Sequence, residues 1–437
     1  MTVRKHFKQL VRARMGKTGE SYATARRHIL RQADPTTDVP WHFPGNVPAT
    51  TALRVLLTAA GVRDPHTGGP FSEAMLYGIA GGVGIGVFSF LYEKENFASF
   101  FVAGHHLFHD HRAYLTGVLG RFGIKPVVHE TTSPKAAAAA LRDALASGPC
   151  VAWVDKSHLP HRGLPSHFSG SGYHIVAIYR QDADGTALIG DLTDRPVAVP
   201  GPALAEARGR IKKDRHRLLS IPPSASRTDL APLVRAGLRA CHRGLTGEGG
   251  VKSARANFSL EALARWADRL HGSAGKESWE RVFAPGPRLW RGLTSIPLFV
   301  EYWGTGGGLG RPLFAEFLTE AADALTDTRL EALADRYAEL GRQWSALADA
   351  ALPADVPEFR EARELFARIG ELTNSGGRPD EIRDAWRRLE ELQGQAGAKF
   401  PMPDADCAAL RAELQRRVRG LYEAEVAAHA ELGRVAG

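Results

Sequence analysis

SGSGYHIVAIYR, at residues 169–180, leads from a glycine-rich turn through His174 into an apolar run that is typical of a buried strand. A second apolar run, ALIG at residues 187–190, ends directly before Asp191. A histidine that enters one strand and a carboxylate that ends the next are the residue types of a general base and the group that orients it. The sequence therefore predicts His174 as a catalytic base and Asp191 as its partner.

A site of this kind also needs a nucleophile at the start of an upstream helix. The segment in the matching position, GNVPATTAL at residues 45–53, contains no cysteine. Thr50 is a candidate nucleophile, although threonine at a helix start is more often an N-terminal cap. Asn46, or backbone N–H groups near Thr50, is predicted to hold an oxyanion.

The composition is that of a soluble globular protein. The chain has 437 residues, 44% of them hydrophobic and 24% charged, which is long enough for two domains. No apolar run approaches the ~18 residues of a membrane span, and the N-terminus lacks the apolar part of a signal peptide. The three cysteines match neither a metal spacing nor a disulfide framework, which favours a reduced, cytoplasmic location.

The formal net charge of +8 is concentrated in the first 31 residues, which hold nine basic side chains and one acid. Two short helices over 3–14 and 20–32 are expected there. Such an arm suits an acidic partner, an acyl carrier protein or tRNA. A solvated arm or an oligomerisation hairpin is the alternative. The basic residues proposed to contact the partner are Arg4, Lys5, Lys8, Arg12, Arg14, Lys17, Arg26 and Arg27.

The order of apolar patterns predicts an α+β fold class with three parts. A basic helical arm (1–34) precedes an α+β domain with an antiparallel sheet (41–222), and an all-α domain (223–437) follows. In the all-α part, apolar residues from Leu330 to Leu347 alternate steps of three and four, which is typical of packed helices. In the α+β domain, the pattern predicts helices at 50–60, 71–77, 112–122 and 133–147, and strands at 150–154, 174–179, 187–189 and 197–199.

Two glycine-rich segments are weak candidates for ligand loops. GVGIG at 82–86 follows a helix, whereas a dinucleotide fingerprint follows a strand, so a turn or close packing is expected. GTGGGLGR at 304–311 is interpreted in the same way, although so bare a loop could admit a ligand.

Four histidines at 105, 106, 109 and 111 are near His129 in sequence, with no glutamate between them. They favour a surface or substrate-lining cluster over a zinc site. We therefore predict neither a metal nor a cofactor.

The cysteines are expected to be unreactive. Cys150 lies inside an apolar strand, whereas a reactive thiolate needs a helix N-terminus or a positive neighbour. Cys241 and Cys407 lie on apolar helical faces and are expected in the core.

Several segments resemble the N-terminal domain of the butirosin biosynthesis protein H (BtrH) family. They are Ala52-Leu53 before Leu56-Leu57, FSEAMLYG at 71–78, GGVG at 81–84, WVD at 153–155, Leu159-Pro160 and GYHIV at 172–176. Residues 304–318 resemble the uncharacterised helical domain that commonly follows it, so the resemblance covers about residues 41–345. It implies a papain-like fold, related to bacteriocin-processing cysteine peptidases, and transfer of an acyl group from a carrier protein to an amine.

In that family a His-Cys pair opens the first helix, with a leucine five residues after the cysteine. Counting back from Leu53 places these positions at Val47 and Pro48, so the cysteine is missing. His174 and Asp191 match the remaining partners. Two functions follow: an acyl- or amide-transfer enzyme of specialised metabolism without a covalent intermediate, or a non-catalytic papain-like protein that binds an acidic partner through its arm.

Overall fold

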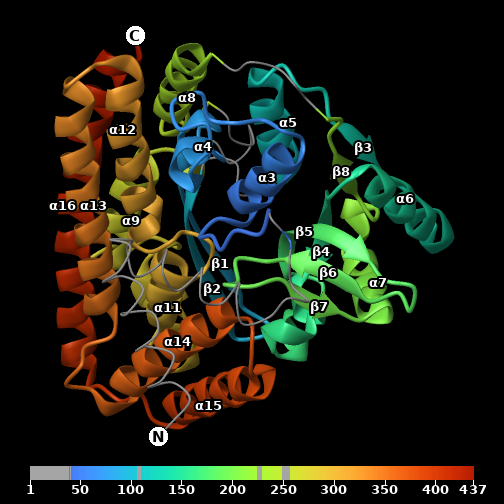
Figure 1. Cartoon of the computed structure of the whole chain (residues 1–437). Helices are drawn as coiled ribbons and strands as arrows, with labels where there is room; N and C mark the ends of the chain where they lie inside the picture. Colours follow the sequence, from blue (N-terminus) through green and yellow to red (C-terminus); the bar gives the residue numbers. More distant parts are fainter. Residues whose placement is uncertain (1–38, 40, 106–109, 224–228, 249–255) are drawn as a thin grey trace, which may run out of the picture.

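The computed structural model describes residues 39, 41–105, 110–223, 229–248 and 256–437. Antiparallel sheets lie in the N-terminal half and helices fill the C-terminal half, so the predicted α+β fold class is confirmed (Figure 1). The basic arm predicted at residues 1–34 lies outside the described residues. Its helices and its contacts with an acidic partner stay predictions.

A six-stranded antiparallel sheet, in the order β3-β8-β4-β5-β6-β7, organises the N-terminal half. Every strand predicted from the sequence lies in this sheet. The two strands of this sheet that were not predicted, β3 and β8, are three residues long each and pair with one another. The strands are β3 (Val127–His129), β4 (Cys150–Asp155), β5 (Tyr173–Gln181), β6 (Ala187–Gly190), β7 (Val197–Val199) and β8 (Leu218–Ser220).

Helices cover both faces of this sheet. One face packs against α3 and the other against α6 and α7. Two of these helices, α3 and α6, begin at a proline after an extended residue, because proline at the first helical position lacks only an N–H that would have no partner in the helix. The helices are α3 (Pro48–Ala59), α4 (Glu73–Ile79), α5 (His111–Arg121), α6 (Pro134–Ser147) and α7 (Gly201–Arg210).

The alternation of side chains along β5 determines on which face of the sheet His174 lies. Ile175 belongs to the core that contains α3, whereas Val176 belongs to a second core with α6 and α7. His174 is paired with Val154 on β4, and Val154 is also part of the second core. Paired residues of antiparallel strands share a face, so His174 lies on the face opposite α3.

A separate hairpin of β1 (Val83–Tyr92) and β2 (Phe97–His105) links the sheet region to the helices. The prediction of a turn at residues 82–86 is therefore wrong for most of that segment, because residues 83–86 form the start of β1. Close packing is present at Gly82, where an added Cβ would lie 2.5 Å from the Tyr77 ring. The hairpin contributes Phe100, whose ring centroid lies 4.9 Å from that of Trp266 in the helical region.

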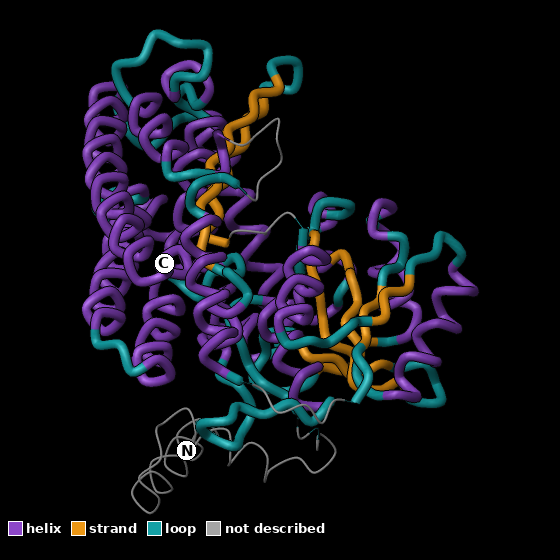
Figure 2. Tube along the Cα trace, turned by 90° about the horizontal axis from the view of Figure 1, so that it is seen from above, coloured by secondary structure: helices purple, strands orange, loops and turns teal. Residues whose placement is uncertain are grey.

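The helical region packs along one side of the molecule, with the six-stranded sheet on the other (Figure 2). Three of its helices, which begin at Arg311, Arg329 and Asp404, lie side by side, and a fully buried ion pair between Arg311 and Glu425 (2.7 Å) joins the first to the third. The described residues contain no helix that is long and apolar enough to cross a membrane. The helices are α8 (Leu230–Gly244), α9 (Glu261–Leu270), α10 (Trp279–Val282), α11 (Pro287–Pro297), α12 (Arg311–Leu325), α13 (Arg329–Ala351), α14 (Pro357–Ser375), α15 (Pro379–Ala398) and α16 (Asp404–Ala436).

Candidate functional site

Three side chains meet at the carboxylate of Asp191, which directly follows β6. His174 Nε2 lies 2.6 Å from Oδ1, while His161 Nε2 and Arg162 Nε each lie 2.7 Å from Oδ2. Arg162 Nη2 also donates to Oδ1, so the guanidinium binds the carboxylate at both oxygens. We call these four residues the Asp191 cluster. Its side chains are at most 10% exposed.

Burial disfavours charge in the Asp191 cluster, yet one carboxylate stays ionised. Although burial opposes it, Arg162 and the two histidines hold the pKa of Asp191 well below its usual value. Burial lowers the pKa of His174 to about 4, more than Asp191 raises it. At neutral pH the cluster therefore combines a carboxylate, a guanidinium and an uncharged His174 ring.

These protonation states identify the tautomer of His174. An ionised carboxylate only accepts hydrogen bonds, so the hydrogen between Nε2 and Asp191 Oδ1 must be on Nε2. Arg162 Nη2 lies 3.0 Å from Nε2 but donates to Asp191, because a protonated Nε2 cannot accept. The lone pair is then on Nδ1, which has no hydrogen-bond partner among the residues that the structure describes. This tautomer is the one that a general base needs.

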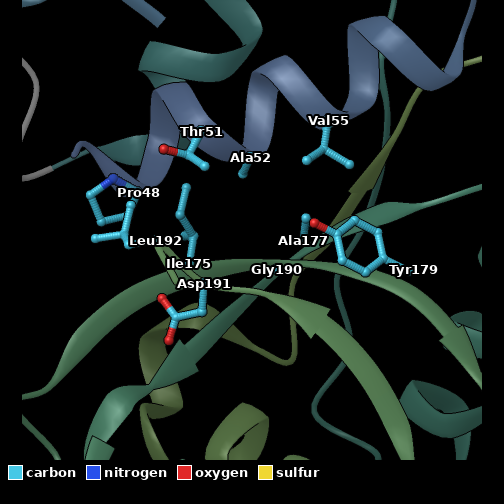
Figure 3. A pocket seen from close by; sticks show the side chains of 10 residues that line it. All are labelled: Pro48, Thr51, Ala52, Val55, Ile175, Ala177, Tyr179, Gly190, Asp191 and Leu192. Atoms are coloured by element: carbon cyan, nitrogen blue, oxygen red, sulfur yellow. The ribbon is translucent and has the colours of Figure 1, made fainter. Parts of the chain in front are cut away.

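The start of α3 lies on the other side of the sheet. Pro48, where the resemblance places the family cysteine, is the first residue of α3 and lines a cavity of about 10 Å³ between that helix and the sheet. Figure 3 shows Ile175 and Leu192 pointing toward α3, while the carboxylate of Asp191 points away from it. A cavity of this size holds about one water molecule. Asp191 lines the same cavity as Pro48, whereas His174, His161 and Arg162 do not.

Asn46 and Thr50 make contacts outside the Asp191 cluster. The backbone N–H and the side-chain Nδ2 of Asn46 donate to the Glu73 carboxylate, at 2.8 and 3.1 Å. The hydroxyl of Thr50 lies 2.8 Å from the hydroxyl of Tyr114, on a buried face of α3 that does not line the cavity. The structure thus brings together His174 and Asp191, but it does not bring Asn46 or Thr50 to them.

Glu73 accepts the hydrogen bonds of Asn46, the residue that was predicted to hold an oxyanion. Its carboxylate also accepts from the Val47 N–H (2.8 Å) and the Thr51 hydroxyl (3.1 Å), which caps the N-terminus of α3. Burial raises the pKa of Glu73, and the donors at the start of α3 oppose that rise. The Glu73 position belongs to the motif FSEA, so this motif supports α3 rather than contacting the Asp191 cluster.

Replacement of Glu73 by glutamine is expected to destabilise the fold by about 1–3 kcal/mol, because the amide offers one acceptor oxygen to donors that include those of the buried Val47 and Thr51. Urea unfolding of the variant and the wild type measures this difference. Glu93→Gln is the matched control, since Glu93 is 72% exposed and its ion pair with Arg281 is weak. Equal losses in both variants would contradict the capping role of Glu73.

The thiols are buried and protonated. Burial raises the pKa of both Cys150 and Cys241 to about 12, and it also raises the pKa of Cys407. A thiol with such a pKa is not a nucleophile at neutral pH.

The histidines near residue 105 form no metal site among the residues that the structure describes. His105 is buried, with its ring centroid 4.4 Å from that of Tyr114 and 6.0 Å from that of Tyr77. Residues 106–109 lie outside the described part of the chain. No group of three or more His, Cys, Asp and Glu residues in the described part could hold a metal ion.

Sequence reasoning missed His161 and Arg162, which provide two of the three partners of Asp191. They lie in a short 3₁₀ turn after β4 (Pro160–Arg162), and the family-like Leu159-Pro160 directly precedes them. Their position next to this family-like pair was the one feature of the sequence that pointed to them. The pairing itself depends on the return of the chain to the end of β6, which no local pattern encodes.

Family models match two consecutive parts of the chain. Residues 48–192 match the N-terminal domain of butirosin biosynthesis protein H, and residues 203–375 match a domain of unknown function (DUF4872). This architecture is the one that the resemblance predicted, and it indicates a biosynthetic enzyme of the BtrH type. The second match begins within α7, before residue 223, where the helical domain was expected to start. No curated protein matches the chain.

Proposed function

We propose that this protein transfers an acyl or aminoacyl group from a carrier thioester, or a similarly activated donor, to an amine in specialised metabolism. The observation that carries the proposal is the tautomer of His174, whose Nδ1 is left as a neutral base by the Nε2–H bond to Asp191. The match to the BtrH domain supports the reaction class. A papain-like fold for the α+β part belongs to the same proposal.

In the proposed reaction the amine attacks the thioester carbonyl directly. His174 Nδ1 removes a proton from the amine as the C–N bond forms, and the same proton then passes to the thiolate when the C–S bond breaks. Asp191 and Arg162 keep the ring in position and in the Nε2–H tautomer. A thioester is reactive enough for this step without prior transfer to the enzyme. Position 48 holds a proline in place of a cysteine, and burial raises the pKa of the Cys150 thiol. Both features agree with direct attack of the amine on the thioester.

The pH dependence of the reaction is expected to reflect the low pKa of His174. The neutral ring is the active form, so the enzymatic rate should rise as the pH is raised through about 4 and show no further rise between pH 5.5 and 6.5. The profile is measured with acetyl-pantetheine as donor and a panel of small amines as acceptors. Mass spectrometry quantifies the amide product at each pH, and the rates are corrected for the ionisation of the amine. A rise centred near 6.5 would indicate an ordinary, solvated histidine.

A non-catalytic binding protein is the second candidate function, and the burial of the Asp191 cluster favours it. An ion network with side chains at most 10% exposed can serve as a structural contact between the sheet and the turn after β4. The basic arm, which lies outside the described residues, is proposed to bind the acidic partner in this case. Binding of a carrier protein or tRNA by the wild-type chain, without formation of any amide, would favour this second function.

A further inference from the structure

Lys156 lies beside the Asp191 cluster, and its half-buried side chain pairs with no carboxylate in the described part of the chain. The residue directly follows β4, and its backbone N–H donates to the Gly172 carbonyl (2.9 Å), two residues before His174. Its Nζ lies 3.7 Å from the centroid of the Trp303 ring. Within the described residues Nζ makes neither an ion pair nor a side-chain hydrogen bond. An ammonium held only by a ring face can still bind a ligand oxygen.

The glycine-rich loop of the helical region connects Trp303, on whose ring Lys156 lies, to the start of α3. Trp303 precedes Gly304, where an added Cβ would lie 3.5 Å from Pro48. At Gly306, an added Cβ would lie 2.8 Å from the Cβ of Asn46, so a side chain there would clash. The loop GTGGGLGR thus packs on the start of α3 with its glycines and positions Trp303 under Lys156.

The proposed acyl transfer lacks a group that stabilises the oxyanion. The Asn46 and Val47 N–H groups at the start of α3 donate to Glu73 and are not available to substrate. Charge on the carbonyl oxygen must nevertheless be stabilised in the transition state, and a preorganised cation in a site of low dielectric does this effectively. Lys156 is a cation whose charge interacts with His174, and its backbone pairs with Gly172 two residues before that histidine, so it is the candidate for this requirement.

We propose that Lys156 is a catalytic residue of the acyl transfer, and that its ammonium binds the carbonyl oxygen of the donor thioester as negative charge develops there. The proposal rests on the proposed function. Lys156 stays protonated throughout: the amine nitrogen bonds to the carbonyl carbon, the π electrons move to oxygen and return, and the thiolate leaves. The proton moves only from the amine through His174 Nδ1 to the thiolate.

The ionisation of Lys156 gives this role a distinctive pH dependence. Burial lowers the pKa of Lys156 to about 7; Arg162 lowers it further, while Asp191 and Asp155 oppose the shift. His174 faces the same region and is neutral at this pH. The ammonium form is lost as the pH rises through about 7, so the wild-type rate should fall there, whereas Lys156→Arg should retain its charge and its rate at higher pH.

The test compares amide formation from acetyl-pantetheine by wild-type chain, Lys156→Arg and Lys156→Gln between pH 5 and 10. Ratios of rates at each pH cancel the ionisation of the acceptor amine. We expect Lys156→Gln to lose on the order of 10²-fold at pH 6. We also expect the ratio of the Lys156→Arg rate to the wild-type rate to increase above pH 7. Lys213→Gln is the matched control, because Lys213 Nζ lies 4.0 Å from the Tyr173 ring centroid but is exposed.

A lysine titration by NMR is independent of turnover. In protein labelled with ¹³C and ¹⁵N at lysine, the resonance that disappears in Lys156→Arg should titrate near pH 7. A midpoint above 9 would overturn the proposal, as would a Lys156→Gln variant with wild-type turnover. Absence of turnover in the wild-type chain would instead contradict the proposed function, and with it this role. Thermal melting of each variant confirms that the fold is intact.

Discussion

Replacement of His174 by alanine is expected to reduce amide formation from a carrier thioester by about 10²–10⁴-fold, the usual contribution of a general base. The ring supplies the lone pair at Nδ1. Asp191 cannot take its place because its pKa is held well below the usual value, and Arg162 cannot because it is a cation without a lone pair. Initial rates of amide formation, determined by mass spectrometry with acetyl-pantetheine and with an acyl carrier protein as donors, measure the loss.

Cys150→Ser is the control for this experiment. Its thiol is fully buried and has a pKa of about 12, so the variant should transfer acyl groups at nearly the wild-type rate. His174→Gln distinguishes loss of the base from loss of packing, because it retains a polar side chain at the same position. If His174→Ala transfers acyl groups at the wild-type rate, then His174 is a structural residue and the catalytic interpretation is wrong.

Replacement of Asp191 by alanine is expected to lower the free energy of unfolding by about 3–5 kcal/mol, since it leaves the Arg162 guanidinium buried without a counter-charge. Asp191 has a depressed pKa in the fold, so its contribution is fully present above about pH 4, the value in the unfolded chain. The contribution is lost as the pH falls through the lower pKa of the folded state. Urea unfolding at pH 7 and at several lower pH values measures both effects.

Two variants control for the loss of an acidic residue. Asp182→Ala removes an exposed carboxylate that pairs with Arg180, and should cost less than about 1 kcal/mol. The double variant Asp191→Leu with Arg162→Met removes both charges and should recover most of the stability that Asp191→Ala loses. If Asp191→Ala unfolds at the wild-type urea concentration, the Asp191 cluster does not stabilise the fold.

The sequence predicts the strands of the central sheet well because their apolar runs are short and bounded by turns. The strands at Cys150–Asp155 and Tyr173–Gln181 and the next two along the chain occur where their patterns indicate. The hairpin of β1 and β2 was missed, since its glycines suggest a turn and its aromatic residues pack on distant helices such as α9. Those contacts are tertiary, so no local pattern reveals them.

The site is predictable only in part from the sequence. The contact of His174 with Asp191 follows from two strand ends that neighbour each other in the sheet. Glu73, His161 and Arg162 are polar residues in turns or at a helix start, where most such residues contact solvent. Their burial arises because the chain returns to α3 or to the end of β6, and sequence spacing alone does not encode that return.

The most direct test of the central claim, acyl transfer by His174 without an acyl-enzyme, is intact-mass analysis of a quenched reaction. Wild-type chain, a carrier protein charged with an acyl group and an amine acceptor are mixed, stopped in acid during turnover and separated. The account predicts amide product in amounts that exceed the enzyme, together with wild-type chain of unmodified mass. An acyl adduct on the chain at Cys150, Thr50 or Thr51 that decays into product, or the absence of any amide, would contradict it.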